Sequence, residues 1–483
     1  MDQKLAVLNR WFGYSSFRPG QDRLIDAILA GRDVLGILPT GGGKSLCYQV
    51  PAMMLPGLTL VISPLLSLMA DQVSRLSSRG IPAAALTSDQ TPSRRRFILR
   101  EAAAGQLRLL YLSPERLEHT EFLSFLPSLS ISLVAIDEAH CISQWGPEFR
   151  PAYRRIPAFL SRLTPRPVTA AFTATATPEV RADIIEAAGL IHPFCLTSGF
   201  DRPNLYYEVR HVRDKRSELL ALLRHYRGFT GIVYCQTRAS VDAVAKFLLR
   251  HRIPAAAFHA GLSASVRTGA LKSWLTDSVT VMVATNAFGM GIDKPDVRYV
   301  IHYSLPCDPE SYYQEAGRAG RDGLPADCIL LVSPRDVAIV RFFIARTASP
   351  ALRALMERRL SAMRSYASGS RCLRASLLTY FGEHAGRWCG ACSVCLRTGP
   401  FRVRVPTGQE DPDLYAALLS IRKNMAAQRG QPACRILSDR ALHDLAVQRP
   451  LSRSEMAAIE GIGLIRTLRS GNAFLEEIRA HTE

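Results

Sequence analysis

A glycine-rich loop at residues 38–45, Leu-Pro-Thr-Gly-Gly-Gly-Lys-Ser, constrains the fold of this chain more than any other stretch. The apolar run at 33–38 leads into the loop and is typical of a buried parallel strand, and a helix can begin at Ser45. A strand, a glycine turn and a helix N-terminus together surround an anion with inward-pointing N–H groups and partial positive charge. The stretch therefore predicts a phosphate-binding loop in an α/β domain.

The polar side chains of this loop suit a nucleoside triphosphate and its magnesium ion. Lys44 is placed to reach the outer phosphates, and the Ser45 hydroxyl is placed to ligate Mg²⁺. The cradle itself is expected from Thr40, Gly41, Gly42 and Gly43. The strict pattern has glycine where Leu38 stands, and the alternative interpretation is a glycine turn before a core helix.

Two carboxylates, Asp137 and Glu138, follow a second apolar run at residues 133–136. In an NTPase, Asp137 would hold Mg²⁺ through its water shell, and Glu138 would orient and deprotonate the attacking water. The carboxyl ends of parallel strands collect at one edge of the sheet, where ligands bind. Together with the loop, this pair predicts ATP hydrolysis, whereas alone it would indicate only a turn.

Three residues upstream of the loop are candidates to contact the base of the nucleotide. Gln21 offers a donor and an acceptor to an adenine edge, Tyr14 can stack on the ring, and Arg18 can approach the base or the phosphates. The alternative is an ordinary turn before a helix at residues 22–29.

An aromatic segment follows the carboxylates almost at once and contains Trp145, Phe149 and Arg150. Such a loop can stack on bases and report their presence to the ATP site, although it can also be an aromatic cluster tucked under a loop. Ser63 ends a predicted strand at 59–64 and is a candidate to hold a nucleic-acid backbone, with helix capping as the alternative.

Residues 12–21, 38–45, 61–73, 137–153 and 172–177 resemble, in this order and spacing, the RecQ-type DNA helicases of helicase superfamily 2. Asp-Glu-Ala-His running into Cys-Ile-Ser-Gln-Trp-Gly is the most specific part. The resemblance implies the nucleotide, Mg²⁺ and catalytic roles described above, a DNA-sensing role for the aromatic segment, and movement from 3′ to 5′ on DNA. In that family a His and then an Asp usually follow Trp-Gly, whereas this chain has Pro and Glu, a difference that bears on the coupling of DNA binding to hydrolysis.

The strand–helix rhythm recurs after residue 199 and predicts a second RecA-like sheet, with strands at 231–235 and 279–285 and a helix at 238–250. The segment that follows contains Gln314, Arg318 and Arg321, which the resemblance places in the last core motif of the helicase. Two arginines three positions apart share a face if the segment is helical. An arginine that reaches the γ-phosphate contributes about 10³–10⁵ in rate, and the alternative is a pair of solvated surface arginines.

Four cysteines, Cys372, Cys389, Cys392 and Cys395, stand at spacings that suit tetrahedral Zn²⁺, with an iron–sulfur cluster as the alternative. The resembled family has a four-cysteine zinc site with this spacing. Residues 341–404 around it contain twelve arginines, no lysine and two acids, which favours binding to phosphates.

The net charge of +18 indicates a polyanionic partner, nucleic acid before membrane. No apolar run is long enough to span a bilayer and the start lacks a signal peptide, so we expect a cytoplasmic protein, associated with the nucleoid if it is bacterial. The expected partner is single-stranded, forked or partly duplex DNA. A single-strand-binding protein is a further candidate, and a monomer is expected.

The predicted class is α/β, with two tandem RecA-like parallel-sheet lobes, a small helical zinc module and a C-terminal helical bundle that resembles the HRDC domain. The expected boundaries are 1–198 (first lobe), 199–335 (second lobe), 336–398 (zinc module), 399–412 (linker) and 413–483 (HRDC-like domain). The linker is too short for the winged-helix domain of larger family members. Two alternatives to a helicase remain open: a DNA-stimulated ATPase that separates strands weakly, and a DNA-annealing module in which ATP acts as a switch.

Overall fold

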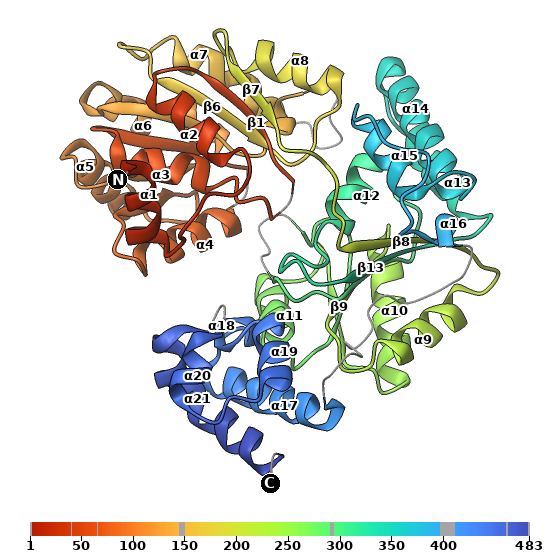
Figure 1. The fold of residues 1–483 in the computed structure, drawn as a ribbon. Helices are drawn as coiled ribbons and strands as arrows, with labels where there is room; N and C mark the ends of the chain where they lie inside the picture. Colours follow the sequence, from red (N-terminus) through yellow and green to blue (C-terminus); the bar gives the residue numbers. More distant parts are fainter. Residues whose placement is uncertain are drawn as a thin grey trace. The chain divides into compact units, whose positions relative to one another are not determined.

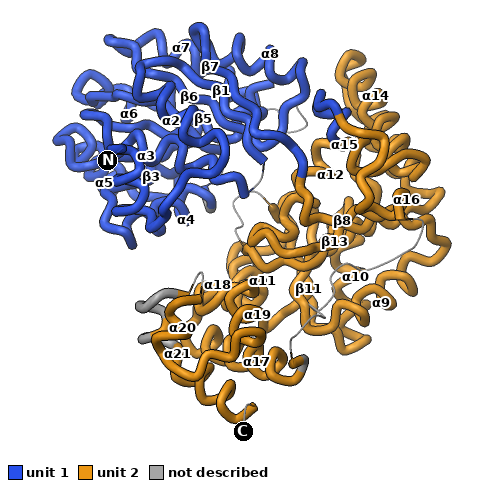
Figure 2. Tube along the Cα trace, in the orientation of Figure 1, with its two compact units in different colours: residues 1–201, 378–384 blue, residues 202–377, 385–483 orange. Residues whose placement is uncertain are grey.

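The computed structural model describes residues 2–39, 41–64, 66–143, 150–289, 294–396, 411–459 and 462–481. The chain divides into two compact units, drawn in different colours in Figure 2. Unit 1 contains residues 1–201 and 378–384, and unit 2 contains residues 202–377 and 385–483. Within the described ranges, no helix combines the length and the apolar character that a membrane crossing requires.

A parallel sheet forms the centre of unit 1 (Figure 1). Among the residues described for this unit, seven strands lie in the order β3-β4-β2-β5-β6-β1-β7. They are β1 (Val34–Ile37), β2 (Leu58–Ile62), β3 (Ala83–Leu86), β4 (Leu109–Leu112), β5 (Ile131–Ile136), β6 (Val168–Thr173) and β7 (Phe194–Thr197). Strands β1, β2 and β4 are buried along their whole length, as expected for parallel strands with both faces covered.

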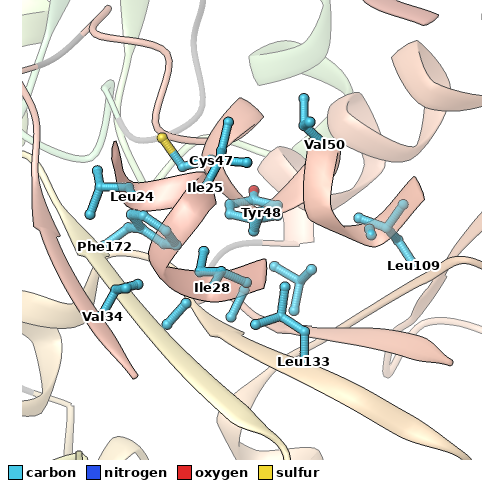
Figure 3. Packing of buried hydrophobic residues seen from close by; sticks show 14 of the residues in the cluster. Leu24, Ile25, Ile28, Val34, Cys47, Tyr48, Val50, Leu109, Leu133 and Phe172 are labelled. Carbon is cyan, nitrogen blue, oxygen red and sulfur yellow. The ribbon is translucent and has the colours of Figure 1, made fainter. Parts of the chain in front are cut away.

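Helices pack on this sheet and close the core of unit 1. They are α1 (Gln3–Val7), α2 (Gln21–Leu29), α3 (Leu46–Met54), α4 (Leu66–Ser77), α5 (Pro92–Ala103), α6 (Thr120–Phe125), α7 (Ile156–Leu160) and α8 (Pro178–Ala187), with short helical turns η1 (Leu8–Phe12), η2 (Pro114–Glu118), η3 (Leu126–Ser128), η4 (Ala139–Ile142) and η5 (Pro151–Arg155). Leu24 and Ile28 of α2 are fully buried and belong to one cluster with Tyr48 and Phe172 (Figure 3). This packing holds α2 against α3, the helix that the phosphate loop enters.

The carboxyl ends of β1, β5 and β6 meet at one edge of the sheet. Beyond β1, the Leu38 N–H donates to the Thr173 carbonyl at the end of β6 (3.1 Å). Beyond β5, the Asp137 N–H donates to the Ile62 carbonyl at the end of β2 (2.8 Å). The predicted phosphate loop and the predicted carboxylates therefore leave the sheet at the same edge.

A second parallel sheet forms the centre of unit 2. In the described part of this unit, six strands lie in the order β10-β11-β9-β12-β13-β8. They are β8 (Leu205–His211), β9 (Gly231–Tyr234), β10 (Ala255–Phe258), β11 (Val281–Ala284), β12 (Tyr299–His302) and β13 (Ala326–Val332), and the helices around them are α9 (Lys215–His225), α10 (Arg238–Arg250), α11 (Ala264–Leu275) and α12 (Pro309–Ala316). Leu222, Val233, Val283 and Ile329 belong to its buried core.

Helices make up the rest of unit 2. The arginine-rich region contains α13 (Asp336–Ala345), α14 (Pro350–Ala367), α15 (Leu373–Tyr380), whose last three residues belong to unit 1, and α16 (Ser393–Leu396). The C-terminal bundle contains α17 (Pro412–Arg429), α18 (Ala433–Ile436), α19 (Asp439–Gln448), α20 (Arg453–Ala458) and α21 (Gly463–Ala480). Inside the bundle, the Arg422 guanidinium is 4% exposed, and it donates to the Asp439 carboxylate (2.6 Å) and to the Leu437 carbonyl (3.1 Å).

These elements confirm the predicted class of two parallel-sheet lobes followed by helical modules. Ser438 and Ser452 cap α19 and α20, as their positions in the sequence predict. The last helix was expected from residue 472 but begins at Gly463. Gly471 lies inside this helix, where a Cβ would meet the Met456 sulfur at 3.1 Å. The expected short strand at 401–405 lies outside the described residues.

Candidate functional site

The phosphate loop leaves β1 and enters α3 through two residues with left-handed backbone. Gly41 and Gly43 have φ values of +82° and +78°, which residues with a Cβ rarely adopt. Position 43 also requires glycine for a steric reason, because a Cβ there would lie 2.4 Å from the Gln21 amide nitrogen. Lys44 and Ser45 are partly buried at the start of α3. Thr40, also predicted in the cradle, lies outside the described residues.

Two side chains predicted to contact the base, those of Gln21 and Arg18, form hydrogen bonds with carbonyls of this loop. Gln21 is 1% exposed; its Oε1 accepts from the Arg18 N–H (2.9 Å), and its Nε2 donates to the carbonyls of Gly42 (3.2 Å) and Gly43 (3.0 Å). The Arg18 guanidinium donates to the Gly41 carbonyl. The amide of Gln21, predicted to recognise an adenine edge, is thus occupied by the loop itself in this structure.

Tyr14 differs from these two residues because its ring is 50% exposed. It follows Gly13, whose φ of +74° ends the helical turn η1. An exposed ring can stack on a base without first losing contacts in the protein.

The carboxylate pair follows β5 in a strained turn. Glu138 has φ 48° and ψ 48°, the left-handed region, which costs a residue with a Cβ about 1–2 kcal/mol. The Asp137 Oδ1 accepts from the Glu138 N–H (3.0 Å), and the Tyr153 hydroxyl donates to the Asp137 carbonyl (3.0 Å). Strain of this kind in a residue with a polar function is common at active sites.

Asp137 is 6% exposed, and its ionisation is unfavourable without a bound cation. Burial and then the charge of Glu138 raise its pKa to about 7, whereas Lys44 and His140 lower it. The ammonium of Lys44 is therefore within electrostatic range of Asp137. A cation such as Mg²⁺ at this carboxylate would restore its charged form.

His140 connects the carboxylates to the end of β6. Its Nδ1 lies 2.9 Å from the Thr173 hydroxyl and 3.5 Å from Glu138 Oε2. The Thr173 hydroxyl also donates to the Thr175 carbonyl (3.1 Å). The sequence identifies His140 and Thr173 as candidates to sense nucleotide state, and the structure brings these two side chains together.

The predicted DNA contacts are described only in part. Trp145 and Phe149 lie outside the described residues. Arg150 is partly buried, and its guanidinium donates to the Pro64 carbonyl (2.8 Å), just after β2. Ser63 is 1% exposed, and its hydroxyl has no hydrogen-bond partner among the described residues. Ser63 is therefore buried in this conformation, whereas its expected contact with a nucleic-acid backbone requires an exposed hydroxyl.

The predicted arginine pair of unit 2 follows α12 rather than continuing it. Helix α12 ends at Ala316 with Gly317 as its C-cap, so Arg318 and Arg321 lie in turns and not on a helix face, and that premise of the prediction is wrong. Gln314, the third member of the motif, lies within α12 and is partly buried.

Arg318 is 9% exposed and donates to the Gly289 carbonyl. Burial raises the pKa of the neighbouring Tyr234 hydroxyl, whereas the charges of Arg318 and Arg321 lower it, so both guanidiniums lie near this one phenol.

The four predicted cysteine ligands converge at one point of unit 2. The sulfur atoms of Cys372, Cys389, Cys392 and Cys395 all lie within 4.8 Å of one another. The Cys372–Cys392 and Cys389–Cys395 sulfur pairs are 3.9 Å apart, which fits a tetrahedron of Zn–S bonds of about 2.3 Å. Burial raises the pKa of Cys372 to about 12 in the absence of metal, so metal binding there releases protons.

Four family models match the chain in sequence order. They are DEAD/DEAH box helicase (residues 18–184), helicase conserved C-terminal domain (214–323), RecQ zinc-binding (334–396) and HRDC domain (411–478). Among solved structures, S. cerevisiae Dbp5 bound to RNA and ADP BeF3 has a TM-score of 0.56 at 17% identity, covering 74% of this chain and 97% of that one. This similarity shows the fold alone. Two parallel sheets with a phosphate loop and an Asp–Glu pair on the first define a nucleotide-driven helicase.

Sequence relatives narrow that class. The ATP-dependent DNA helicase RecQ of Bacillus subtilis (strain 168) is 34% identical over 580 residues, covering 99% of this chain and 98% of that protein. The ATP-dependent DNA helicase RecQ of Pasteurella multocida (strain Pm70) is 44% identical over 422 residues, covering 87% of this chain and 65% of that protein. The chain belongs to the RecQ family of ATP-dependent DNA helicases. The cofactors are accordingly ATP with Mg²⁺, and Zn²⁺ at the four cysteines.

Two contacts in unit 2 were missed by the sequence analysis. Arg202 and Asn204, in the segment before β8, donate to carbonyls of the loop that carries Arg318 and Arg321. No local pattern in the sequence marks them, because the residues they contact lie more than a hundred positions away.

Proposed function

We propose that this chain hydrolyses ATP to move from 3′ to 5′ along single-stranded DNA and to unwind duplex DNA in recombination and repair. The observation that supports it best is the arrangement in unit 1. There the phosphate loop with Lys44 and the carboxylates Asp137 and Glu138 leave the sheet at the same edge, and the charge of Lys44 lowers the pKa of Asp137. A phosphate-binding cation, a metal-binding carboxylate and a candidate base in one place are the parts that phosphoryl transfer to water requires.

In this proposal each residue of the unit 1 site has one task. The cradle of Thr40, Gly41, Gly42 and Gly43 binds the phosphates through its N–H groups, and Lys44 neutralises their charge. Ser45 and Asp137 would hold Mg²⁺, which would neutralise charge on the phosphates. Glu138 orients the attacking water and accepts its proton.

Binding of the adenine base involves Tyr14, Arg18 and Gln21. The exposed Tyr14 ring is available to stack, whereas Gln21 must first exchange its loop contacts for the base. The third contribution comes from Gln314, Arg318 and Arg321, which we propose act on the γ-phosphate of bound ATP. For Arg318, this requires release from the Gly289 carbonyl, and such a change is suited to a step that follows nucleotide binding.

DNA contact is assigned to Ser63, Trp145, Phe149 and Arg150. The Arg150 guanidinium donates to the Pro64 carbonyl, directly after Ser63, so a DNA strand must displace this contact before Arg150 can bind it. The arginine-rich helices around the zinc cluster would add sequence-independent phosphate contacts.

A second candidate function is a DNA-stimulated ATPase that translocates or anneals DNA with weak strand separation. It is favoured by the short distance between the zinc-binding match, which ends at residue 396, and the HRDC match, which begins at 411. That interval leaves no room for a winged-helix domain with a strand-separating hairpin.

Unwinding of a forked DNA duplex with ATP and Mg²⁺ distinguishes the two functions. The helicase proposal predicts strand separation by the wild type and none by Glu138→Gln. Strong DNA-stimulated hydrolysis without strand separation would favour the second function. Comparing stimulation by single-stranded DNA and RNA tests the preference for DNA.

We further propose the domain boundaries 1–198, 199–335, 336–398, 399–412 and 413–483. A monomer is the proposed working form, with a single-strand-binding protein as a candidate partner. Because the proposed substrate is chromosomal DNA, we place the protein in the cytoplasm, at the nucleoid if the cell is bacterial.

A further inference from the structure

The loop that carries Arg318 and Arg321 has no regular structure of its own to hold it. It begins where α12 ends, at Gly317, and passes through turns before β13. Turn hydrogen bonds tie the Arg318 and Ala319 N–H groups to α12, and the Gly320 N–H donates to the Val297 carbonyl (2.9 Å), whereas carbonyls of the loop accept from side chains elsewhere in unit 2. We define residues 317–321 as the arginine loop.

One side chain, Arg202, holds three carbonyls of the arginine loop. Its guanidinium donates to the carbonyls of Gly317 (3.2 Å), Ala319 (3.0 Å) and Gly320 (3.0 Å). A planar guanidinium presents its donors in a fixed fork, so three acceptors define the orientation of the loop as well as its distance. The carbonyls involved flank Arg318 on both sides.

Asn204 adds two contacts at the far end of the loop. Its amide nitrogen donates to the carbonyls of Gly320 (2.8 Å) and Leu324 (2.9 Å). Gly320 fits this contact closely: its φ is +55°, and a Cβ there would lie 2.5 Å from the same nitrogen. A side chain at position 320 would therefore clash with the Asn204 amide.

Arg374, in the zinc module, holds the backbone of Arg202. Its guanidinium donates to the carbonyls of Arg202 (2.7 Å) and Leu205 (2.6 Å) and lies 5.7 Å from the centre of the Tyr207 ring. Arg374 is 6% exposed and stands two residues after the zinc ligand Cys372. A second ligand, Cys392, forms a backbone bridge with Tyr207 of β8.

We propose that Arg202 is a positioning residue for ATP hydrolysis and that Arg374 makes this positioning depend on the zinc cluster. The first statement rests on the proposed role of Arg318 and Arg321. Arg202 orients the arginine loop through its carbonyls, and Arg374 fixes the backbone from which Arg202 extends. Because a misplacement of about 1 Å can cost on the order of 10² in rate, loss of these contacts should act on turnover.

The first test compares Arg202→Met with Arg250→Met in DNA-stimulated ATP hydrolysis. Met keeps an apolar stem but has no donors, and Arg250 is an exposed arginine at the end of α10 in the same unit. The proposal predicts that Arg202→Met lowers kcat about ten- to hundredfold and changes the KM for ATP less than about twofold, while Arg250→Met changes neither. Arg202→Lys, which keeps a charged donor, should recover part of kcat.

A merely structural role would give a different result. It would lower the melting temperature and the amount of folded enzyme, leave kcat per folded enzyme at the wild-type value, and show no recovery in Arg202→Lys. Equal kcat for Arg202→Met and wild type, or loss confined to KM, would overturn the proposal. If Arg202→Met does not fold, Asn204→Ala is the second variant, with a predicted kcat loss of about threefold or more and an unchanged KM; wild-type kcat would overturn the proposal.

Arg318→Ala and Arg321→Ala separate this inference from the proposed function. If both retain wild-type turnover, the arginine loop is not catalytic and the proposed function fails at this point. If either loses turnover while Arg202→Met and Asn204→Ala keep it, the proposed function stands and the positioning inference is wrong.

The link to the zinc cluster is tested with Arg374→Met and the double variant Arg202→Met/Arg374→Met, with zinc content measured for each. The proposal predicts that Arg374→Met retains one zinc per chain, lowers kcat, and adds little to the loss in the double variant because it acts through Arg202. Independent effects that multiply in the double variant, or wild-type kcat in an Arg374→Met variant that retains its zinc, would overturn the link.

Discussion

Lys294 is the residue of unit 2 whose removal should have the clearest effect on stability. Its side chain is 0% exposed, and its ammonium lies 2.8 Å from Asp277 and 3.1 Å from Asp296. Burial alone would lower the pKa of Lys294, but Asp296 and Asp277 raise it above its ordinary value. Lys294→Met would leave two largely buried carboxylates without this cation.

Breaking a buried pair by removing one partner costs about 3–5 kcal/mol. For domains of 150–250 residues, each kcal/mol shifts the melting temperature by about 2–4 °C; unit 2 is larger than this, so we take the lower figure and predict a loss of about 6–10 °C at pH 8. The control is Arg155→Met in unit 1, which breaks a 2.6 Å pair with Glu118 whose side chains are 47% and 50% exposed. An exposed pair contributes about 0–1 kcal/mol.

The pH dependence of the loss has a definite sign. In the wild type, Lys294 and Arg422 hold the pKa of Asp296 below its ordinary value against burial, so this stabilisation is present above pH 4 and is lost as acid protonates the carboxylate. Without Lys294 the pKa of Asp296 rises, and the variant regains stability relative to the wild type as the pH falls from 8 to 5. Calorimetry at both pH values measures this. A loss no larger than that of Arg155→Met, or one that grows on acidification, would refute the reasoning.

Three further predictions concern the active site and the metal. Asp137→Asn should stabilise the nucleotide-free protein by up to about 4 kcal/mol at pH 8, because the pKa of Asp137 in the folded protein, about 7, exceeds the ordinary value of 3.8. The gain in stability, measured by thermal unfolding, should shrink towards pH 4. ATP hydrolysis should be lost. Glu138→Gly should be more stable to urea than Glu138→Ala by about 1 kcal/mol, because glycine adopts the φ of 48° without strain; equal midpoints would contradict it. Removing zinc with a chelator should unfold the zinc module, since such sites supply roughly 10–16 kcal/mol, and circular dichroism should follow the released zinc; soluble active protein without zinc would oppose this.

Local patterns in the sequence predict the parts of the fold that depend on neighbouring residues. The helix at 238–250 and the strand entering the phosphate loop have the predicted places because their apolar periodicity and glycine punctuation are contained in a few residues. The buried, apolar β13 was missed, although its run at 326–332 carries the same kind of signal.

Features that depend on distant residues could not be predicted in the same way. The sequence analysis placed Arg318 and Arg321 on one helix face, whereas they lie in a loop held in part by Arg202, which Arg374 supports across a separation of 172 positions. Gln21 illustrates a different limit: its amide suits an adenine edge and also a loop carbonyl, and only the fold shows that the carbonyls are within reach. Burial of Ser63 likewise follows from packing and not from its place after an apolar run.

The central claim is that ATP bound at Lys44 is hydrolysed by Glu138 in response to DNA. It is tested most directly by the steady-state rate of ATP hydrolysis, with and without single-stranded DNA, for the wild type, Lys44→Ala and Glu138→Gln. We predict hydrolysis that DNA stimulates in the wild type, and none above background in either variant, although both fold and retain most of their DNA binding. Wild-type turnover in either variant, or wild-type hydrolysis that DNA does not stimulate, would contradict the account.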